Sequence, residues 1–476
     1  MRLLVDAHNR ASPTRGAAAA RAPGRVPETA ASRAVVGAVL AGLTVVMLLS
    51  TPRSLLAQQA QEGRPHAQDR QEETHARPAS PRDSVRHDPD ALILYTSDGS
   101  GKLRYASRDG DVEGRIGGRI MFDHSVGSVG DDLEPAVGAM ADGTEFRRVR
   151  LFTEGSIYDI GYKFQVEFAG APSIEDMYLV FPSPVPHSDI RVGKFKEDIS
   201  LVEITSSKYI TFMARPMLTE FAGGRDLGVR LGGRADGGDL NYGVGVYRAR
   251  VGDAPGASQG DGDYKGTGRV TYVPWSRDEN RKLVHVGASG SFASLDPEDP
   301  SVEAHEPEVH LAPDFLDTGP LDAEHTTRLG LESALVYNSF SVRAEVLRQT
   351  YGLDAGGADP TFDSWYVAGS YFLTGESRPY DGGGFGRVAP NEHVRAGNDD
   401  GLGAWEVAAR FSAMDLSDGG VVGGAASTIT LGVNWYLNPS VRVMANYTHA
   451  AVEDAVGTAG ADGTGRFLSM RVQLDF

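Results

Sequence analysis

The 476-residue chain contains no cysteine. A disulfide, a thiolate metal site and a cysteine nucleophile are therefore excluded. Beyond residue 60 the sequence also lacks any run of about 18 apolar residues, the length that a membrane-spanning helix requires. Only 41% of all residues are hydrophobic. These absences argue against a membrane protein built from helices.

Basic residues are outnumbered by acidic ones, 46 against 64, and the formal net charge is −18. This acid excess argues against nucleic acid as a partner, because nucleic acids bind to basic surfaces. It does not determine the charge inside a pore, which depends on where the individual side chains lie.

Motifs that carry catalysis are missing as well. No Ser/His/Asp set has a strand–elbow–helix setting, and the glycine-rich residues 223–228 lack the strand–loop–helix context of a nucleotide-binding loop. The scattered histidines include His305, His310 and His325 in an acidic segment, which we interpret as a solvated surface loop; a divalent-cation site is the alternative. We predict no enzyme activity, no catalytic residue, no metal and no cofactor.

The first 57 residues are typical of a leader with a signal peptide. Arg33 precedes an apolar stretch from Ala34 to Leu49, and small residues follow. A positive charge, a short apolar core and a small residue near the cut are features of secretory signals, whereas an uncleaved anchor is the alternative. We expect cleavage near Ala57 or Ala60. Residues 58–110 contain little to bury and are predicted to form a polar linker.

Short segments of alternating apolar and polar residues make up the rest of the chain, residues 111–476. Alternation with a period of two predicts strands that have one apolar and one polar face. The 59 glycines suit many short strands and turns. We count sixteen segments, at about 115–124, 144–157, 159–169, 173–182, 189–196, 225–234, 240–250, 265–275, 281–292, 326–337, 339–350, 362–374, 403–414, 425–437, 440–449 and 465–476.

The last segment shows the alternation most clearly. Its apolar face carries Leu468, Met470, Val472, Leu474 and Phe476. Its polar face includes Arg471 and Gln473, so we expect that face to meet water.

A transmembrane β-barrel needs strands of about 9–11 residues and leaves no edge unpaired, whereas a strand of a β-sandwich is the alternative. We predict an all-β fold, a transmembrane antiparallel β-barrel of about 16 strands, whose last strand pairs with the first near Ile116–Phe122. An outer aromatic belt is expected to include Trp365, Trp405, Trp435, Tyr436 and Tyr447.

The connections between the segments mostly alternate between short and long. Such alternation is typical of outer-membrane barrels, with tight turns at one end and long loops at the other. Two connections break the pattern, a brief one at Ala171–Pro172 and a long one at Gly375–Gly401. The second should be a tight turn in this scheme, so either the count is wrong there or that segment folds inside the barrel.

Seven stretches resemble the family of phosphate-selective porins O and P, and the match covers most of residues 115–476. They are GTEFRRVRL (143–151), VGKFK (192–196), SSKYITFM (206–213), GRDLGV (224–229), SYFLTGE (370–376), GFGRV (384–388) and LGVNWYLNP (431–439). The resemblance implies a sixteen-stranded bacterial outer-membrane porin, usually a trimer, that passes anions. It also implies that the third loop folds into the lumen and forms the constriction.

Here the third loop corresponds to residues 197–224, whose apolar interior favours packing against the inner wall. Arginine and lysine suit anions, the first through paired hydrogen bonds and the second as a compact charge. Where the family carries an arginine cluster, this loop offers only Lys208 and Arg215, together with four acidic residues, so strict phosphate selectivity is not predicted. For every cation the alternative is a wall charge paired with an acid. The candidate anion-binding residues are Lys194, Lys196, Lys208, Arg215, Arg225, Arg230 and Arg234.

The sequence therefore predicts an outer-membrane porin for passive diffusion of small anions, with phosphate or polyphosphate as the preferred cargo. A general or weakly selective porin for small hydrophilic solutes is the alternative, and a lipase-like barrel enzyme is the rival from another class. The partners implied by the resemblance are small anions, outer-membrane lipids and lipopolysaccharide, the barrel-insertion machinery at Phe476, and further copies of the chain in a homotrimer.

Overall fold

The computed structural model of the chain describes residues 92–96, 103–140, 142–248, 263–354, 357–394 and 401–476. All of them belong to one compact unit, Arg64–Phe476. The predicted leader, residues 1–57, and most of the predicted linker lie outside the described residues.

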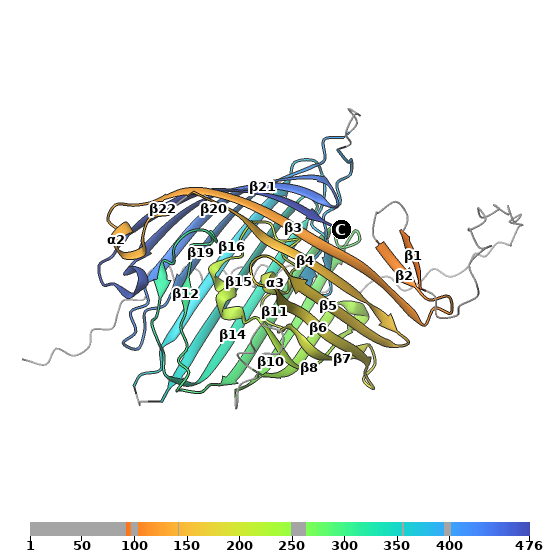
Figure 1. Cartoon of the computed structure of the whole chain (residues 1–476), viewed down its shortest axis with the longest axis horizontal. Helices are drawn as coiled ribbons and strands as arrows, with labels where there is room; N and C mark the ends of the chain where they lie inside the picture. The colour runs from red at the N-terminus through yellow and green to blue at the C-terminus, as the bar shows by residue number, and fades with distance from the viewer. Residues whose placement is uncertain (1–91, 97–102, 141, 249–262, 355–356, 395–400) are drawn as a thin grey trace, which may run out of the picture. The chain divides into compact units, whose positions relative to one another are not determined.

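Sixteen antiparallel strands close into a barrel (Figure 1), and each corresponds to one of the predicted segments. Every strand pairs with its neighbours in the chain, and the last strand pairs with the first, so no edge is left open. The strands are β3 (Val112–Val129), β4 (Gly143–Ile157), β5 (Ile160–Glu167), β6 (Ser173–Pro182), β7 (Ser188–Lys196), β8 (Arg225–Ala235), β9 (Leu240–Arg248), β10 (Tyr264–Arg277), β11 (Lys282–Ser294), β14 (Ala323–Tyr337), β15 (Phe340–Leu353), β16 (Thr361–Phe372), β19 (Ala404–Asp415), β20 (Ala425–Asn438), β21 (Val441–Glu453) and β22 (Gly463–Asp475).

The remaining elements are short. Two of them, β1 and β2, form a hairpin, and β2 pairs with the first residues of β3. This hairpin lies within the segment predicted as a linker. Within the described residues, no helix combines the length and the apolar character needed to cross a membrane. The short elements are β1 (Ile93–Thr96), β2 (Leu103–Ala106), β12 (Ala304–His305), β13 (Leu316–Asp317), β17 (Tyr380–Asp381), β18 (Gly384–Phe385), α2 (Glu134–Val137), α3 (Leu201–Ile204), η1 (Met217–Ala222), η2 (Asp236–Gly238) and η3 (Ala455–Gly457).

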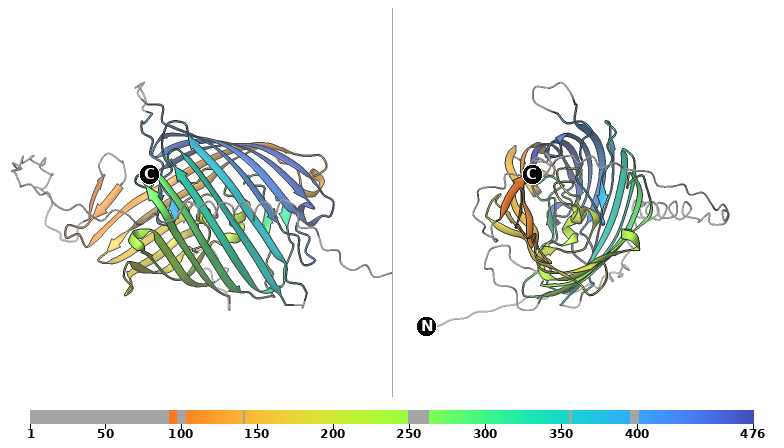
Figure 2. Two further views of the ribbon diagram at one scale, coloured as in Figure 1. Left: turned by 180° about the vertical axis from the view of Figure 1, so that it is seen from behind. Right: turned by 90° about the vertical axis from the view of Figure 1, so that its right-hand side faces the viewer.

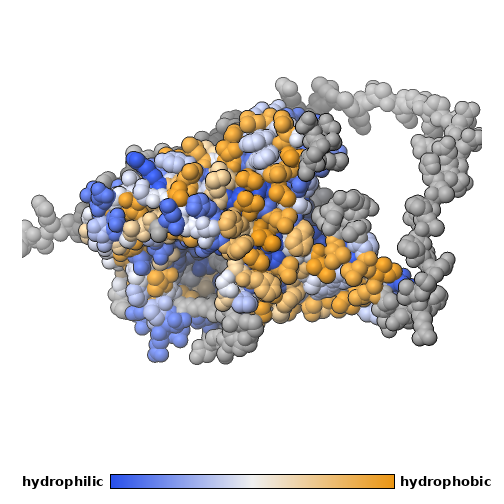
Figure 3. All heavy atoms as spheres, turned by 45° about the horizontal axis from the view of Figure 1, so that its top comes forward, coloured by the Kyte–Doolittle hydropathy of each residue, from blue (hydrophilic) through white to orange (hydrophobic). Residues whose placement is uncertain are grey.

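The outer face of the barrel is apolar. On β22 the apolar residues predicted to share one face are all exposed, whereas Arg471 and Gln473 are buried on the other. Figure 3 shows apolar side chains gathered over the strands of the face in view, and hydrophilic ones toward the long connections at its left end. A continuous exposed apolar surface requires apolar surroundings, and alternating lipid-facing residues are what a membrane barrel provides.

The closing pair of strands overlaps the predicted region, Ile116–Phe122, in part and continues beyond it, whereas Ile116 pairs with Leu103 of β2. Register partners run from Asp475–Arg119 to Gly465–Val129. The backbone of Phe476 exchanges hydrogen bonds of 3.1 and 3.2 Å with Gly118. The last strand is therefore paired along its whole length.

Three connections fold into the interior, and we name them the inner loop (197–224), the acidic loop (295–322) and the strap (373–394). In the view along the barrel (Figure 2, right) the inner loop lies within the ring of strands. Its Ile210, Phe212 and Phe221 are buried in one apolar cluster with Phe362 and Tyr366 of the wall. This packing gives a physical reason for the loop's apolar composition, because burial removes that surface from water.

The strap explains why the twelfth connection is long. It leaves the barrel end where the short turns lie, yet it returns into the lumen instead of turning tightly. Arg378 of the strap is fully buried, pairs with Glu406 of β19 and donates to the Tyr209 carbonyl at 3.2 Å. The predicted strand count was therefore right, and the connection is long because it folds inside the barrel, as the second of the two explanations proposed.

Two details of the predicted faces are wrong. Tyr436 does not belong to an outer belt: it is buried in the interior, and its hydroxyl donates to Glu406 at 2.9 Å. Arg471 and Gln473 do face inward, and both donate to carbonyls of the inner loop, although Arg471 also lines the open cavity described below. Outside, Trp405 and Trp435 stack with their ring centroids 5.2 Å apart.

The apolar outer face leads to a stability prediction. We expect Val472→Arg, on the lipid side of β22, to destabilise the folded barrel by about 2–4 kcal/mol, because charge in the hydrocarbon region is costly. Denaturant titration in lipid vesicles measures the change. Thr464→Arg, at the rim of the same strand, is the control, for which about 0–1 kcal/mol is expected. Equal losses in the two variants would contradict a lipid-facing Val472.

Candidate functional site

Side chains of the barrel wall and of the strap hold the backbone of the inner loop in place. Residues 208–214 have no regular secondary structure, so their carbonyl groups need partners from elsewhere. Six of these seven carbonyls accept a hydrogen bond from an inward-facing side chain. The pairs are Gln473 with Lys208 (3.1 Å), Arg378 with Tyr209 (3.2 Å), Arg442 with Ile210 (2.8 Å), Asn434 with Thr211 (2.8 Å), Arg471 with Met213 (2.8 Å) and Arg410 with Ala214 (2.9 Å).

Carboxylates fix the backbone amides at two further points of the inner loop. Glu345 of β15 accepts from the amides of Leu201 and Val202, at 2.8 and 2.9 Å, where α3 begins. Glu308 of the acidic loop accepts from the Met217 amide at 3.1 Å, where η1 begins. Residues 201–217 of the loop are thus bound to the wall formed by β15 and β19–β22. The opposite side of the lumen is left more open, although Arg119 of β3 and Arg230 of β8 reach Ser207 and Asp198 of the loop.

A cavity of about 660 Å³ occupies that open side, between the inner loop and strands β3–β10. Thirteen cationic side chains line it, against eight carboxylates. The charge of the lining is therefore opposite in sign to the net charge of the chain. The cations are Arg119, Arg147, Arg148, Arg150, Lys163, Arg191, Lys196, Arg215, Arg225, Arg230, Arg234, Arg269 and Arg471.

Five of the seven predicted anion-binding residues line this cavity: Lys196, Arg215, Arg225, Arg230 and Arg234. The other two, Lys194 and Lys208, are buried outside its lining.

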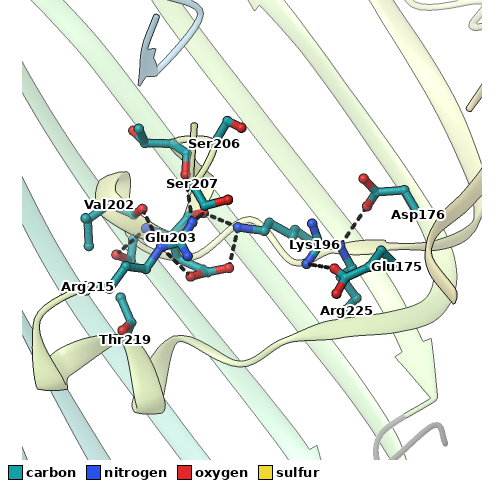
Figure 4. Close-up of polar contacts among 12 residues, drawn as sticks. Glu175, Asp176, Lys196, Val202, Glu203, Ser206, Ser207, Arg215, Thr219 and Arg225 are labelled. Carbon is teal, nitrogen blue, oxygen red and sulfur yellow. Dashed lines mark hydrogen bonds and ion pairs between the residues drawn. The ribbon is translucent and has the colours of Figure 1, made fainter. Parts of the chain in front are cut away.

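The cations nearest the inner loop are paired with acids (Figure 4). Glu203 of α3 lies between Lys196 and Arg215, with 3.0 Å between its Oε2 and the Arg215 Nε. Arg225 of β8 contacts two neighbouring acids of β6, Glu175 at 2.6 Å and Asp176 at 2.8 Å. Burial acts to raise the pKa of Glu203, but Arg215 and Lys196 outweigh it, and its pKa lies below the ordinary value. Glu203 therefore stays charged and neutralises part of this cluster.

Arg230, farther along β8, is also paired. Its guanidinium contacts Asp198 of the inner loop and lies 3.7 Å from Asp189. It rests against Gly232 and Gly243, where a Cβ atom would come within 2.0 and 2.8 Å of it. Glycine at these positions lets the side chain lie along the wall, so the lumen beside it stays open. Arg234, near the short-turn end, pairs at 3.0 Å with Asp381 of the strap, and both side chains are exposed.

A group of cations that the sequence did not single out lies on β3 and β4. Arg147 is the extra residue of a β-bulge, because Met121 pairs with Arg148 and Phe122 with Phe146. A bulge re-aims side chains, and here Arg147 and Arg148 both line the cavity. Among the residues that the structure describes, neither has a hydrogen-bond or ion-pair partner. The signal available in the sequence was the pair of adjacent arginines, which interrupts the alternation.

Arg119, next to this pair on β3, is bound only by neutral groups. It donates to Ser207 and, at 3.0 Å, to Gln165. Its charge is therefore not cancelled by a direct carboxylate partner among the described residues.

The three histidines of the acidic segment do not come together. His305 lies 3.3 Å from Glu303, His310 lies 2.8 Å from Glu145, and His325 stacks on a phenylalanine of β11. Within the described ranges no group of three or more His, Cys, Asp and Glu side chains is placed to hold a metal ion.

Comparison with known proteins gives a family. A sequence model described as "Phosphate-selective porin O and P" matches residues 118–476. Porin O of Pseudomonas aeruginosa is 26% identical over 441 residues, which cover 83% of this chain and 94% of that protein. An uncharacterized protein of Caulobacter vibrioides is 28% identical over 381 residues, or 77% of this chain and 75% of that one.

Solved structures with a similar chain path are outer-membrane proteins. The anion-selective porin from Comamonas acidovorans aligns with a TM-score of 0.48 at 13% identity, over 77% of this chain and 100% of that one. The outer-membrane channel DcaP of Acinetobacter baumannii aligns with a TM-score of 0.49 at 12% identity, over 78% and 99% of the two chains.

The contacts to the inner loop lead to a prediction about its order. We expect Arg442→Met to loosen residues 208–214, because the Ile210 carbonyl loses a hydrogen bond to a charged donor, worth about 1.5–3 kcal/mol. Hydrogen exchange of peptides from the inner loop should speed up without loss of the barrel. Arg348→Met removes a mostly exposed pair with Asp363 and is the control. An unchanged exchange rate in the first variant would show that the contacts are dispensable.

Lys208 leads to a prediction about pH. Burial, with Arg119 nearby, lowers the pKa of Lys208 from 10.5 to about 7, and Asp475 offsets this only in part. The folded state then prefers the neutral amine, so the free energy of unfolding should rise as pH increases from about 7 to 10.5. Thermal unfolding in detergent measures this rise, and Lys208→Met should flatten it. An equal rise of stability with pH in the wild-type protein and in the variant would contradict the assignment of this rise to Lys208.

Proposed function

We propose that this chain, which belongs to the phosphate-selective porin O and P family, is a channel for passive diffusion of small anions across the bacterial outer membrane. The main support is the cavity, where cations outnumber carboxylates thirteen to eight in a chain of net charge −18. A cleft lined mostly by one sign of charge concentrates ions of the other sign. The family and the barrel support a channel role and not a catalytic one.

In this proposal, cations with an acid partner and cations without one have different roles. Arg147 and Arg148, which have no acid partner among the described residues, attract anions into the cavity together with Arg119. The predicted residues Lys196, Arg215, Arg225, Arg230 and Arg234 line the next part of the path, where carboxylates temper their charge. A conducting pore needs such a balance, because an ion must bind well enough to enter and weakly enough to leave. Lys194 and Lys208 lie outside the lining and act on the path only through their charge.

Phosphate or polyphosphate is the proposed cargo. The supports are the relative named Porin O and the number of guanidinium groups, which bind phosphate oxygens through paired hydrogen bonds. A general or weakly selective porin is the second candidate. Its support is the acid set Glu175, Asp176 and Glu203, which pairs with three of the cations beside the inner loop.

A homotrimer is part of the proposal. Strands β5, β6 and β7 have 8, 10 and 9 residues, against 15 in β14. At about 3.3 Å per residue and a tilt of about 40°, eight residues rise about 20 Å, less than the apolar band of about 25 Å. We propose that this low wall faces another copy, and that lipid and lipopolysaccharide contact the rest. The native mass in detergent measures the number of chains in the assembly, and a single-chain mass would contradict the trimer.

Recognition of Phe476 by the insertion machinery remains a proposal from the family.

The reversal potential across a planar bilayer in a salt gradient tests the proposed function. We expect anion preference in the wild-type channel and a reduction of chloride current by added phosphate. In Arg147→Glu/Arg148→Glu, the ratio of anion to cation permeability should fall by about fivefold or more, since one charge at close range is worth about 1 kcal/mol even in water.

Arg234→Glu is the matched control, because Arg234 is exposed and already paired with Asp381; a smaller change is expected there. Cation preference of the wild-type channel would overturn the anion channel. Anion preference without any effect of phosphate would leave the general porin as the function.

A further inference from the structure

Among the described arginines that line the cavity, Arg191 of β7 is the one whose guanidinium lies on aromatic rings. Its guanidinium carbon is 4.5 Å from the ring centroid of Tyr178 and 5.3 Å from that of Phe195. These two rings meet edge to face with centroids 5.8 Å apart, and Phe195 meets Tyr247 in the same way at 5.5 Å. One guanidinium thus lies on a ridge of aromatic rings contributed by β6, β7 and β9.

No carboxylate of the described residues pairs with Arg191. Its register partner on β8, Arg230, takes both nearby acids, Asp198 and Asp189. The Arg191 Nε is buried without a hydrogen-bond partner, and so is the Asn241 Nδ2, which lines the same cavity. Buried donors without acceptors are unfavourable, and the two side chains that carry them also line the cavity, where an anionic acceptor would meet them.

The backbone of β7 is adapted to this arrangement. Gly193 has a φ of +134°, and a Cβ atom there would come within 2.2 Å of the Met177 carbonyl oxygen. Only glycine lets β6 and β7 approach so closely. The close approach brings the Tyr178 and Phe195 rings together beneath Arg191.

The position along the pore separates Arg191 from the paired cluster at the inner loop. Lys196 pairs in register with Arg225, and Arg191 pairs with Arg230. Five residues of strand correspond to about 16 Å along the strand, or about 13 Å along the barrel axis at a tilt of about 40°, toward the short-turn end. An anion that has passed the inner loop would meet Arg191 next.

We infer that Arg191, Tyr178 and Asn241 form a second anion subsite, suited to carboxylates attached to a planar apolar body such as an aromatic ring. A stacked guanidinium presents its edge to a carboxylate in a fixed plane, and the neighbouring rings offer apolar contact to the rest of the ligand. A small inorganic anion would use only the first contact. The inference rests on the proposed anion channel, because the ligand must enter from the cavity.

Inhibition of single-channel chloride current by benzoate and by acetate tests this subsite. Both are monocarboxylates, so they differ in the apolar ring that the subsite would contact. In the wild-type channel we expect benzoate to inhibit at a concentration roughly threefold to tenfold lower than acetate, the range that one aromatic contact provides. Arg191→Lys keeps the charge and loses the planar stack, and Tyr178→Leu removes the ring. In both variants the two inhibitory concentrations should converge.

Arg348→Lys is the control and should keep the wild-type ratio, because Arg348 is mostly exposed, pairs with Asp363 and lies outside the cavity lining. Single-channel chloride events in every variant show that the barrel has folded and inserted, so a lost ratio cannot come from misfolding. Equal inhibition by benzoate and acetate in the wild-type channel would overturn the subsite, as would an unchanged ratio in Arg191→Lys. The reversal potential is read separately: anion preference with equal inhibition overturns the subsite alone, and cation preference overturns the channel proposal on which it rests.

Discussion

An irregular backbone can lie inside a membrane barrel only when its polar groups are bonded, and this constraint organises the lumen. The carbonyls of the inner loop have no strand neighbours, so the wall must supply donors. Three arginines on β19, β21 and β22, one on the strap and two side-chain amides do so. Arg410, Arg442 and Arg378 hold the loop and lie outside the cavity lining, whereas Arg471 holds the loop, pairs with Asp123 and also lines the cavity.

This arrangement divides the interior into two unlike halves. Toward β15–β22 the space is filled by the apolar cluster of the inner loop, the acidic loop and the wall. Toward β3–β10 the cavity is polar and open, and its cations outnumber its acids. Residues of the same type thus have different roles: Arg442 holds a carbonyl, Arg225 balances two carboxylates, and Arg147 has no partner among the described residues.

The paired cations beside the inner loop fit a channel better than a tight binding site. A ring of unpaired guanidinium groups would hold an anion strongly, whereas Glu203, Glu175 and Asp176 reduce that attraction. Arginines of the lining that have no acid partner in the described part of the chain lie elsewhere, at the bulge of β4 and at Arg191 of β7. Attraction and release can then be provided by different parts of one path.

The sequence by itself determined the strand count, the face of each strand and the apolar character of the inner loop, because alternation and composition are local properties. The same alternation would have placed Tyr436 inside, since its neighbour Trp435 faces outward. Which cations face the solute was decided only by the tertiary structure, because the partners are far apart in the chain. Arg442 binds a carbonyl at position 210, and Arg471 pairs with Asp123 across the closing seam. Alternation tells which side of a strand a residue occupies, but not what lies opposite it in the lumen.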